Sequence, residues 1–188
     1  VSGICSLYLY SAQQRNINFM LIEMTDDKEV PVMDSQHARQ TPTDAPNPTP
    51  IKVWIDRIQF DKVITNLLSN AFKYTFDGGE VKVILGQEGK HVLIQIIDSG
   101  IGFKEENTDR LFERFYQGKS PNSLHIEGTG IGLNLSRAIV QMHGGQVRAF
   151  NRTDGQRGAC LEVRIPLGNA HLKPEEIEDG QTETAIRS

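Results

Sequence analysis

Apolar side chains recur at helical spacing between residues 56 and 75, and the rest of the chain is organised around this stretch. They form a single stripe: Phe60, Val63, Ile64, Leu67, Leu68 and Ala71. Asp56 precedes them and is suited to cap the first turn of a helix. The pattern therefore predicts a helix from Asp56 to about Tyr74 whose apolar stripe faces a core.

A polar stripe runs along the same predicted helix. Asn66, Asn70 and Lys73 are spaced i, i+4 and i+7, so their side chains share a second face. Asparagine inside a helix costs up to about 0.7 kcal/mol relative to alanine, so two of them in line need a reason. Alone, the stripe fits either a solvated face or a binding site. Two glycine-rich turns further along the chain favour the binding site.

The remaining apolar patterns predict strands in hairpin pairs and two shorter helices. Strands are expected over 18–24, 51–55, 80–85, 91–98, 146–150 and 159–167, with a charged turn at 25–29. Helices are expected over 107–115 and 130–143, and the second should face the core with Ile131, Leu135, Ala138, Ile139 and Met142. Paired strands predict a mixed, largely antiparallel sheet with helices on one face, which is an α+β fold.

Segments without hydrophobic period divide the chain. Residues 31–50 contain five prolines, which predicts a disordered or extended loop inserted between two strands. His37 in this loop lacks the helix and the adjacent acid that a phosphate-accepting histidine needs. We expect residues 1–12 to be the end of an upstream helix or linker, 13–168 to be one domain, and 169–188 to be a polar tail or linker.

Composition excludes several classes of protein. A net charge of −4 over 188 residues argues against a nucleic-acid-binding surface, which usually needs a basic patch. The two cysteines, Cys5 and Cys160, have no spacing typical of a disulfide framework or a zinc site, so a reducing compartment is expected. No apolar run approaches the roughly 20 residues of a membrane span, and no signal peptide is visible.

Two glycine-rich turns carry the candidate chemistry. In the first, Asp98 ends a strand, and its carboxylate could accept a hydrogen bond from an exocyclic amine such as that of adenine. Gly100 and Gly102 let the backbone approach a ligand. The second turn, residues 128–133, opens a helix, whose first backbone amides can bind an anion. The Rossmann fingerprint is excluded, because Leu133 replaces the third glycine and no strand precedes the turn.

Cations and a metal ligand for a phosphate-bearing compound are also present. Lys73, Arg114 and Lys119 could neutralise phosphate charge together with a divalent metal. Mg²⁺ prefers oxygen ligands and takes few of them from the protein, so the carboxamide of Asn70 is suitable. A Walker A motif is excluded, because Glu113 stands where its first glycine should be.

Four segments resemble, in order and spacing, the N, G1, F and G2 boxes of the catalytic ATP-binding domain of sensor histidine kinases. They are Asn66/Asn70/Lys73/Tyr74, DSGIGF at 98–103, LFERFYQ at 111–117 and GTGIGLNLSRAIVQMHGG at 128–145. This domain belongs to the superfamily of gyrase B, the ninety-kilodalton heat-shock chaperone and MutL. The resemblance covers about residues 51–167. It implies a two-layer α/β sandwich of the Bergerat type, with a mixed sheet covered on one face by three helices.

The resemblance also implies roles for the matching residues around Mg²⁺ and ATP. Asn70 would hold Mg²⁺, Tyr74 would lie along the nucleotide, and Asp98 would bind the adenine amine. The candidate catalytic residues, at the phosphates, are Asn66, Asn70, Lys73 and Arg114. Further contacts to the nucleotide, under a flexible lid, would come from Lys73, Gly100, Gly102, Phe112, Phe115, Gly128, Thr129, Gly130, Gly132 and Leu133.

The activity implied is transfer of the γ-phosphoryl group of ATP to a histidine of a phosphoacceptor domain, in cis or in trans within a homodimer. That domain is not visible in this sequence, and a response regulator or receiver domain would act downstream. We expect the cytoplasmic catalytic part of a longer, hybrid sensor that reaches the membrane only through its other parts. The alternative is a nucleotide-binding regulatory module or ATPase of the same superfamily without histidine transfer. ATPase-type relatives carry a carboxylate where this chain has Asn66, which favours the kinase.

Overall fold

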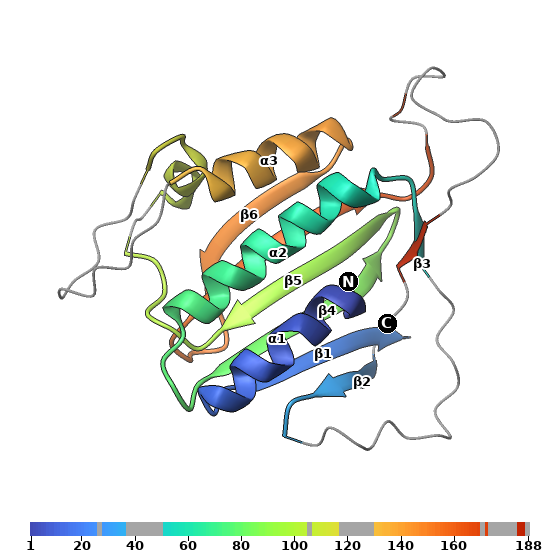
Figure 1. Ribbon diagram of the computed structural model, residues 1–188. Coiled ribbons are helices and arrows are strands. Elements are labelled where there is room, and N and C mark those ends of the chain that lie inside the picture. Colours follow the sequence, from blue (N-terminus) through green and yellow to red (C-terminus); the bar gives the residue numbers. More distant parts are fainter. Residues whose placement is uncertain are drawn as a thin grey trace.

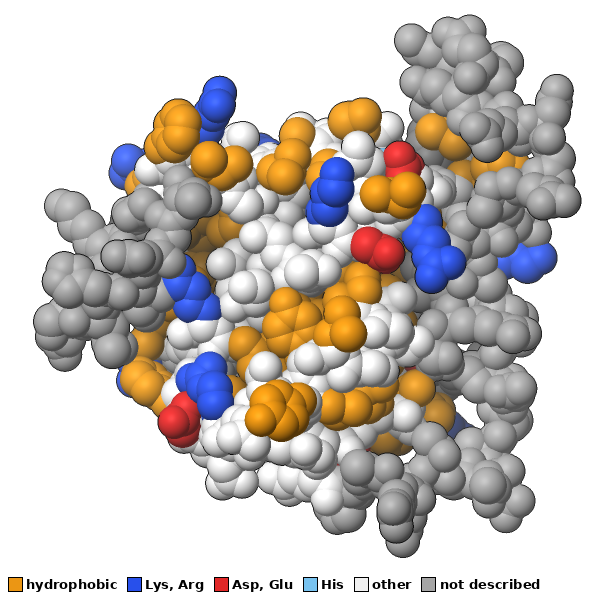
Figure 2. All heavy atoms as spheres, viewed as in Figure 1, with side chains coloured by type: hydrophobic (Ala, Val, Ile, Leu, Met, Phe, Trp, Pro, Cys, Tyr) orange, Lys and Arg blue, Asp and Glu red, His pale blue; other side chains and the backbone are white. Residues whose placement is uncertain are grey.

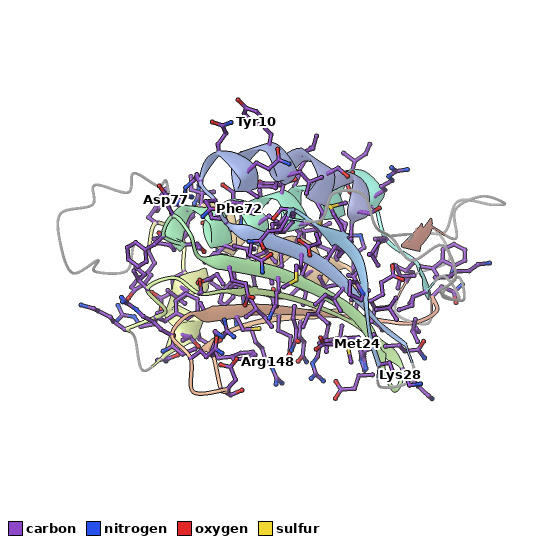
Figure 3. The ribbon with its side chains drawn as sticks, turned by 90° about the horizontal axis from the view of Figure 1, so that it is seen from below. Tyr10, Met24, Lys28, Phe72, Asp77 and Arg148 are labelled. Atoms are coloured by element: carbon purple, nitrogen blue, oxygen red, sulfur yellow. The ribbon has the colours of Figure 1, made fainter. Side chains whose placement is uncertain are left out.

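The structure, a computed structural model, describes residues 1–25, 28–36, 51–104, 107–116, 130–169, 172 and 184–186. A six-stranded sheet forms one layer, and helices α1 (Ser2–Gln14), α2 (Arg57–Tyr74) and α3 (Gly132–Met142) form the other (Figure 1). An edge-on view shows α1 and α2 on one side of the sheet (Figure 3). The predicted two-layer α/β sandwich is confirmed.

The sheet has the strand order β2-β1-β4-β5-β7-β6. Its β1 and β4 strands run parallel, and the other neighbouring pairs run antiparallel. The sheet is therefore mixed and mainly antiparallel, as predicted. Its strands are β1 (Asn18–Thr25), β2 (Lys28–Asp34), β4 (Glu80–Glu88), β5 (His91–Asp98), β6 (Gln146–Asn151) and β7 (Ala159–Pro166).

The edge strand β2 corrects the prediction of a turn at 25–29 and a loop from residue 31. Residues 28–34 pair antiparallel with β1, and Pro31 lies opposite Ile22. Proline is compatible with an edge strand, because such a strand needs no hydrogen-bond donor on its outer side. The register also shifts beside Ile22, as a bulge does. The rest of the predicted loop, residues 37–50 with His37, lies outside the described residues.

Three short elements also differ from the prediction. Strand β3 (Ile51–Val53) is shorter than predicted and pairs with β8 (Thr184–Ile186) in a separate two-stranded sheet. The segment predicted to be only a polar tail thus contributes a strand, which is too short to show a hydrophobic period. The helix predicted over 107–115 is a 3₁₀ helix, η1 (Thr108–Phe112), and the Asn107 side chain caps it.

Helix α2 lies at the centre of the helical layer and of the core. Its predicted apolar stripe is confirmed, because all six side chains are at most 3% exposed: Phe60, Val63, Ile64, Leu67, Leu68 and Ala71. Asp56 accepts a hydrogen bond from the Gln59 amide at 3.0 Å, which confirms the predicted cap. Burial of a valine, leucine, isoleucine or phenylalanine side chain stabilises a fold by about 1.5–3 kcal/mol, so this stripe fixes α2 on the sheet.

Helix α1 continues two residues beyond the predicted end at residue 12 and joins the same core. Cys5 and Ala12 are fully buried in it. The Tyr8 ring lies 5.0 Å from the Phe72 ring, and the Tyr8 hydroxyl donates a hydrogen bond to the Thr65 carbonyl at 3.0 Å. The domain boundary predicted at residue 13 therefore falls inside this helix. In the part of the chain that the structure describes, no helix has both the length and the apolar character needed to cross a membrane.

Helix α3 corrects the predicted inward face. Of the five predicted side chains only Ile139 is buried, and the inward positions are Ser136, Ile139 and Val140. The helix approaches α2 through a hydrogen bond from Asn66 to Ser136. Ser136 therefore faces inward, where the apolar pattern predicted Leu135. The remaining four predicted core residues are exposed, Ile131 just before the helix and Leu135, Ala138 and Met142 on it.

His143 joins the end of α3 to the start of α2. Its Nε2 accepts the Asp56 amide hydrogen at 2.9 Å, and its Nδ1 lies 2.8 Å from the Ile139 carbonyl oxygen. These partners require a neutral ring with the proton on Nδ1. The side chain is 6% exposed, so both hydrogen bonds are shielded from water.

Replacing His143 with alanine should lower the free energy of unfolding by about 1–3 kcal/mol, because the Asp56 amide loses its partner. His91→Ala is the matched control, since His91 is exposed at the start of β5, and it should change stability by less than about 0.5 kcal/mol. Urea denaturation followed by circular dichroism measures both. Equal stability of the two variants would show that the hydrogen bond between His143 and the Asp56 amide does not stabilise the fold.

Candidate functional site

Asp98 ends β5 with a buried carboxylate that is 5% exposed. Its Oδ1 accepts hydrogen bonds from the backbone amides of Gly100 at 2.8 Å and Ala159 at 3.3 Å. Both bonds go to one oxygen, so Oδ2 can still accept a donor from a ligand. Burial raises the pKa of the Asp98 carboxyl, although the two amides and the Arg152 guanidinium act in the opposite direction.

The turn after Asp98 lies directly against the end of α2. A Cβ atom added at Gly100 would overlap the carbonyl oxygen of Tyr74, so only glycine allows this approach. The turn continues through Gly102 to Phe103, whose amide donates to the Asn151 Oδ1 at 2.6 Å. The structure therefore places the turn after Asp98 against the backbone of Tyr74, and both residues were predicted to belong to one site.

The predicted polar stripe is present on α2, with Asn66, Asn70, Lys73 and Tyr74 all half-buried. Within the described part of the chain, the Asn70 carboxamide has no hydrogen-bond partner. The Lys73 Nζ lies 5.4 Å from the centre of the Tyr74 ring, and partial burial lowers the pKa of the Lys73 ammonium. The stripe thus runs from the Asp98 turn toward α3.

Asn66 connects this stripe to the start of α3. Its Nδ2 donates a hydrogen bond to the Ser136 hydroxyl at 2.9 Å, and Ser136 is 1% exposed. A Cβ atom at Gly132 would overlap the Asn66 Oδ1, so the backbone of α3 begins in contact with the carboxamide. Leu133 follows and is half-buried.

The segment after η1 lies beside the start of α3. Phe112 is buried in the core, whereas Phe115 is 63% exposed. The Phe115 amide donates to the Gly130 carbonyl at 2.9 Å, and the Arg114 guanidinium lies 4.9 Å from the Phe115 ring centre. Arg114 therefore lies next to the residue that pairs with Gly130, and its own side chain is exposed. Residues 117–129, which include Lys119, Gly128 and Thr129, lie outside the described residues.

An open groove on the outer face of α2 is separate from this site. Asp61, Lys62, Thr65, Asn66 and Ser69 line it, so it shares only Asn66 with the candidate site. In the space-filling view, uncharged polar surface separates the apolar side chains over α3 from those nearer α1 (Figure 2).

The donor set fits a magnesium ion that is bound mainly through a phosphate ligand. Among the described residues, no three His, Cys, Asp or Glu side chains cluster as a metal site. Mg²⁺ usually keeps several waters and takes one or two protein oxygens together with substrate phosphates. The Asn70 carboxamide offers such an oxygen beside the Lys73 ammonium, which would share the phosphate charge.

Several residues around the site escaped the sequence interpretation. Ser136 lies within the segment 128–145 that resembles the G2 box, but the apolar pattern predicted Leu135 as the inward side chain. Ala159 acts through its backbone amide, which any residue could supply. The Arg152 side chain is 6% exposed behind the Asp98 turn and pairs with Asp154 at 2.5 Å. The contacts of Ala159 and Arg152 depend on strand pairing, and that of Ser136 depends on the packing of α3 against α2, neither of which the sequence shows.

Comparison with known proteins places the chain in a family. The family described as "Histidine kinase-, DNA gyrase B-, and HSP90-like ATPase" matches residues 55–169, more than half of the 188 residues. The chain belongs to this family of ATP-binding domains, and the resemblance stated from its four boxes is confirmed.

Individual relatives are sensor histidine kinases. Histidine kinase P4 of Formosa agariphila is 35% identical over 130 residues, which are 68% of this chain and 9% of that protein. The chain spans 9 to 33% of the length of the first curated relatives that it matches.

Solved structures share the fold. The catalytic domain of histidine kinase ThkA, in a nucleotide-free form, has a TM-score of 0.63 and 23% identity, with 88% of each chain covered. Full-length ShkA in complex with AMPPNP has a TM-score of 0.60 and 18% identity, over 91% of this chain and 30% of that one.

Replacing Asp98 with asparagine should stabilise the protein at neutral pH. The folded-state pKa of Asp98 is raised above its usual value of 3.8. The folded protein therefore prefers the protonated carboxyl, and its stability falls as the pH rises from 3.8 to the folded-state pKa. The gain from Asp98→Asn should therefore be largest at pH values above the folded-state pKa and should disappear as the pH falls below 3.8. Urea denaturation of both proteins over this pH range measures it, and a gain that grows on acidification would contradict the assignment.

Proposed function

We propose that this chain binds Mg-ATP and transfers the γ-phosphoryl group to a histidine of a separate phosphoacceptor domain. One observation carries the proposal: the Asp98 turn contacts Tyr74, from which the polar stripe of α2 leads to the start of α3. Tyr74 and Asn66 are separated by two turns of α2, about 12 Å at 1.5 Å per residue. This length is comparable with the distance from the base to the terminal phosphate of ATP.

The base is proposed to bind at Asp98. The Oδ2 oxygen is available to accept the hydrogen bond of an exocyclic amine, while the two backbone amides on Oδ1 hold the carboxylate in place. A buried acceptor that lacks its donor is costly, so this pocket favours adenine over a base that presents a carbonyl there. AMPPNP, which is bound in the ShkA structure, is an adenine nucleotide.

The phosphates are proposed to lie along α2 from Lys73 toward Asn66. The Lys73 ammonium and the Asn70 carboxamide are three residues apart on α2 and so face the same side of the helix. Arg114 lies near the start of α3, beside the Phe115 ring. Asn70 would ligate Mg²⁺, which when bound would neutralise charge on the phosphate oxygens. The backbone at the start of α3 adds amide donors for the terminal phosphate.

Transfer then needs positioning rather than acid–base chemistry. Phosphoryl transfer depends mainly on alignment and charge neutralisation, and a neutral imidazole is already a nucleophile. Hydrolysis, by contrast, would need a group that activates water. The nearest candidate position carries Asn66, whose amide group donates to Ser136 and cannot take a proton. The site therefore favours transfer to histidine over ATP hydrolysis.

Replacing Asn70 with alanine should remove the magnesium dependence of nucleotide binding. The wild-type chain should bind AMPPNP at least about tenfold more tightly with Mg²⁺ than without, whereas Asn70→Ala should bind equally weakly in both, since it lacks the ligand oxygen. Ser69→Ala is the matched control, because Ser69 is the exposed neighbour on α2. Isothermal titration calorimetry measures all three, and a magnesium effect that survives in Asn70→Ala would overturn the metal assignment.

The exposed apolar face of α3 is proposed to receive the phosphoacceptor helix. Leu135 and Met142 are 47% and 73% exposed, and Ile131 at 39% continues the face to the phosphate end of the site. Apolar side chains lie along the upper part of the surface in the view of the helical layer (Figure 2). A histidine must reach the γ-phosphoryl group, so a helix docked on this face would arrive beside it. A response regulator or receiver domain would then take the phosphoryl group from that histidine.

Replacing Leu135 with aspartate should slow phosphotransfer at least about tenfold, because a charge in a buried apolar contact is unfavourable. AMPPNP affinity should be unchanged, since Leu135 is exposed on α3 and is not among the residues assigned to the nucleotide. Leu7→Asp is the control, because Leu7 is 73% exposed on α1. The assay mixes the chain, labelled ATP and a separately prepared phosphoacceptor domain of a sensor histidine kinase. No transfer by the wild type despite nucleotide binding would refute the proposed kinase activity. Equal rates for Leu135→Asp and Leu7→Asp would refute the proposal that the phosphoacceptor helix docks on α3.

A further inference from the structure

Arg15, at the end of α1, holds the end of α2 with three nitrogen atoms. Its Nη1 donates to the Phe72 carbonyl at 2.5 Å, its Nη2 to the Thr75 carbonyl at 2.6 Å, and its Nε to the Asp77 carboxylate at 2.7 Å. The Arg15 carbonyl in turn accepts the Gly78 amide at 3.0 Å. Phe72 and Asp77 both lie at the same end of the molecule, on the helical side of the sheet (Figure 3).

These contacts supply hydrogen-bond donors to carbonyl groups at the end of α2. The last carbonyl groups of a helix have no partner within it, and a cation at this end interacts favourably with the helix dipole. The planar guanidinium reaches three acceptors in fixed directions, which a lysine ammonium cannot do in the same way. The side chain is about one-third exposed, at 35%, so its hydrogen bonds matter more for geometry than for stability.

The segment that Arg15 holds is the one that the Asp98 turn contacts. Tyr74 lies between Phe72 and Thr75, and its carbonyl touches Gly100. Thr75 is 2% exposed and its hydroxyl donates to the Ala71 carbonyl at 2.7 Å. A shift of this last turn would therefore be transmitted directly to the backbone beside Asp98.

We infer that Arg15 is a positioning residue for the base end of the nucleotide site, through its hold on residues 72–77. It touches no nucleotide. Its effect is confined to the relative placement of Tyr74, Gly100 and Asp98. Asn70 and Asn66 lie one and two turns back along α2, whose apolar face is packed in the core, and Asn66 is also bonded to Ser136 of α3. The inference rests on the proposed function, because it presumes that this site takes a nucleotide.

Arg15→Lys tests the inference, because it keeps the charge and loses the three-way geometry. The dissociation constants of ADP and AMPPNP should both rise about tenfold, the scale of one charge-assisted hydrogen bond. Magnesium tripolyphosphate, which has no base, should bind as it does to the wild type. Calorimetry measures the three ligands at low temperature, with each constant corrected for the folded fraction obtained from urea denaturation. This correction keeps the comparison valid for a destabilised variant.

Arg164→Lys is the matched control, because Arg164 has a similar exposure of 33% and also forms ion pairs, on β7. It should leave all three ligands unchanged. The inference would be overturned if Arg15→Lys bound ADP as tightly as the wild type does. It would also be overturned if the affinity for tripolyphosphate fell as much as that for ADP, because the whole site would then be disturbed. A wild-type chain that binds neither ADP nor AMPPNP would instead refute the proposed function, so the two failures are distinguishable.

Discussion

The contact between Gly100 and the Tyr74 carbonyl is the constraint on which the candidate site depends. It leaves no room for a side chain, and it joins the end of β5 to the end of α2 at one point. Asp98 is held in the same turn by two backbone amides. The position of the buried carboxylate relative to the polar stripe of α2 therefore follows from backbone packing, which is more rigid than any single side-chain contact.

Helix α2 serves the core and the site with two different faces. The apolar face fixes its height and rotation on the sheet, and this rotation points Asn66, Asn70 and Lys73 to one side. The neighbouring helices then complete the arrangement from opposite sides. On one side α3 meets Asn66 through Ser136, and on the other the end of α1 holds the last turn through Arg15. Stability and site geometry are thus carried by the same helix.

The sequence predicted the parts of this arrangement that repeat or that glycine marks. The apolar stripe of α2, its Asp56 cap, the hairpin strands and the mixed sheet were all readable from periodicity, and the four boxes indicated the family. Contacts between distant segments were not readable. The rotation of α3 was missed, because Ser136 is inward for a hydrogen bond to α2 and the apolar pattern ignores such bonds. The strands β2 and β8 were missed because a proline and a short length hide pairing that only tertiary contacts create.

Asp98 shows how the site and the stability of the fold oppose each other. Burial disfavours its charged form, yet an acceptor for an adenine amine needs that buried oxygen. The account as a whole is tested most directly by amide chemical-shift mapping of the ¹⁵N-labelled chain during titration with Mg-AMPPNP. It predicts that the largest shift changes fall on residues 98–102 and on the second half of α2. Changes confined to the open face of the sheet, or none at saturating nucleotide, would contradict it.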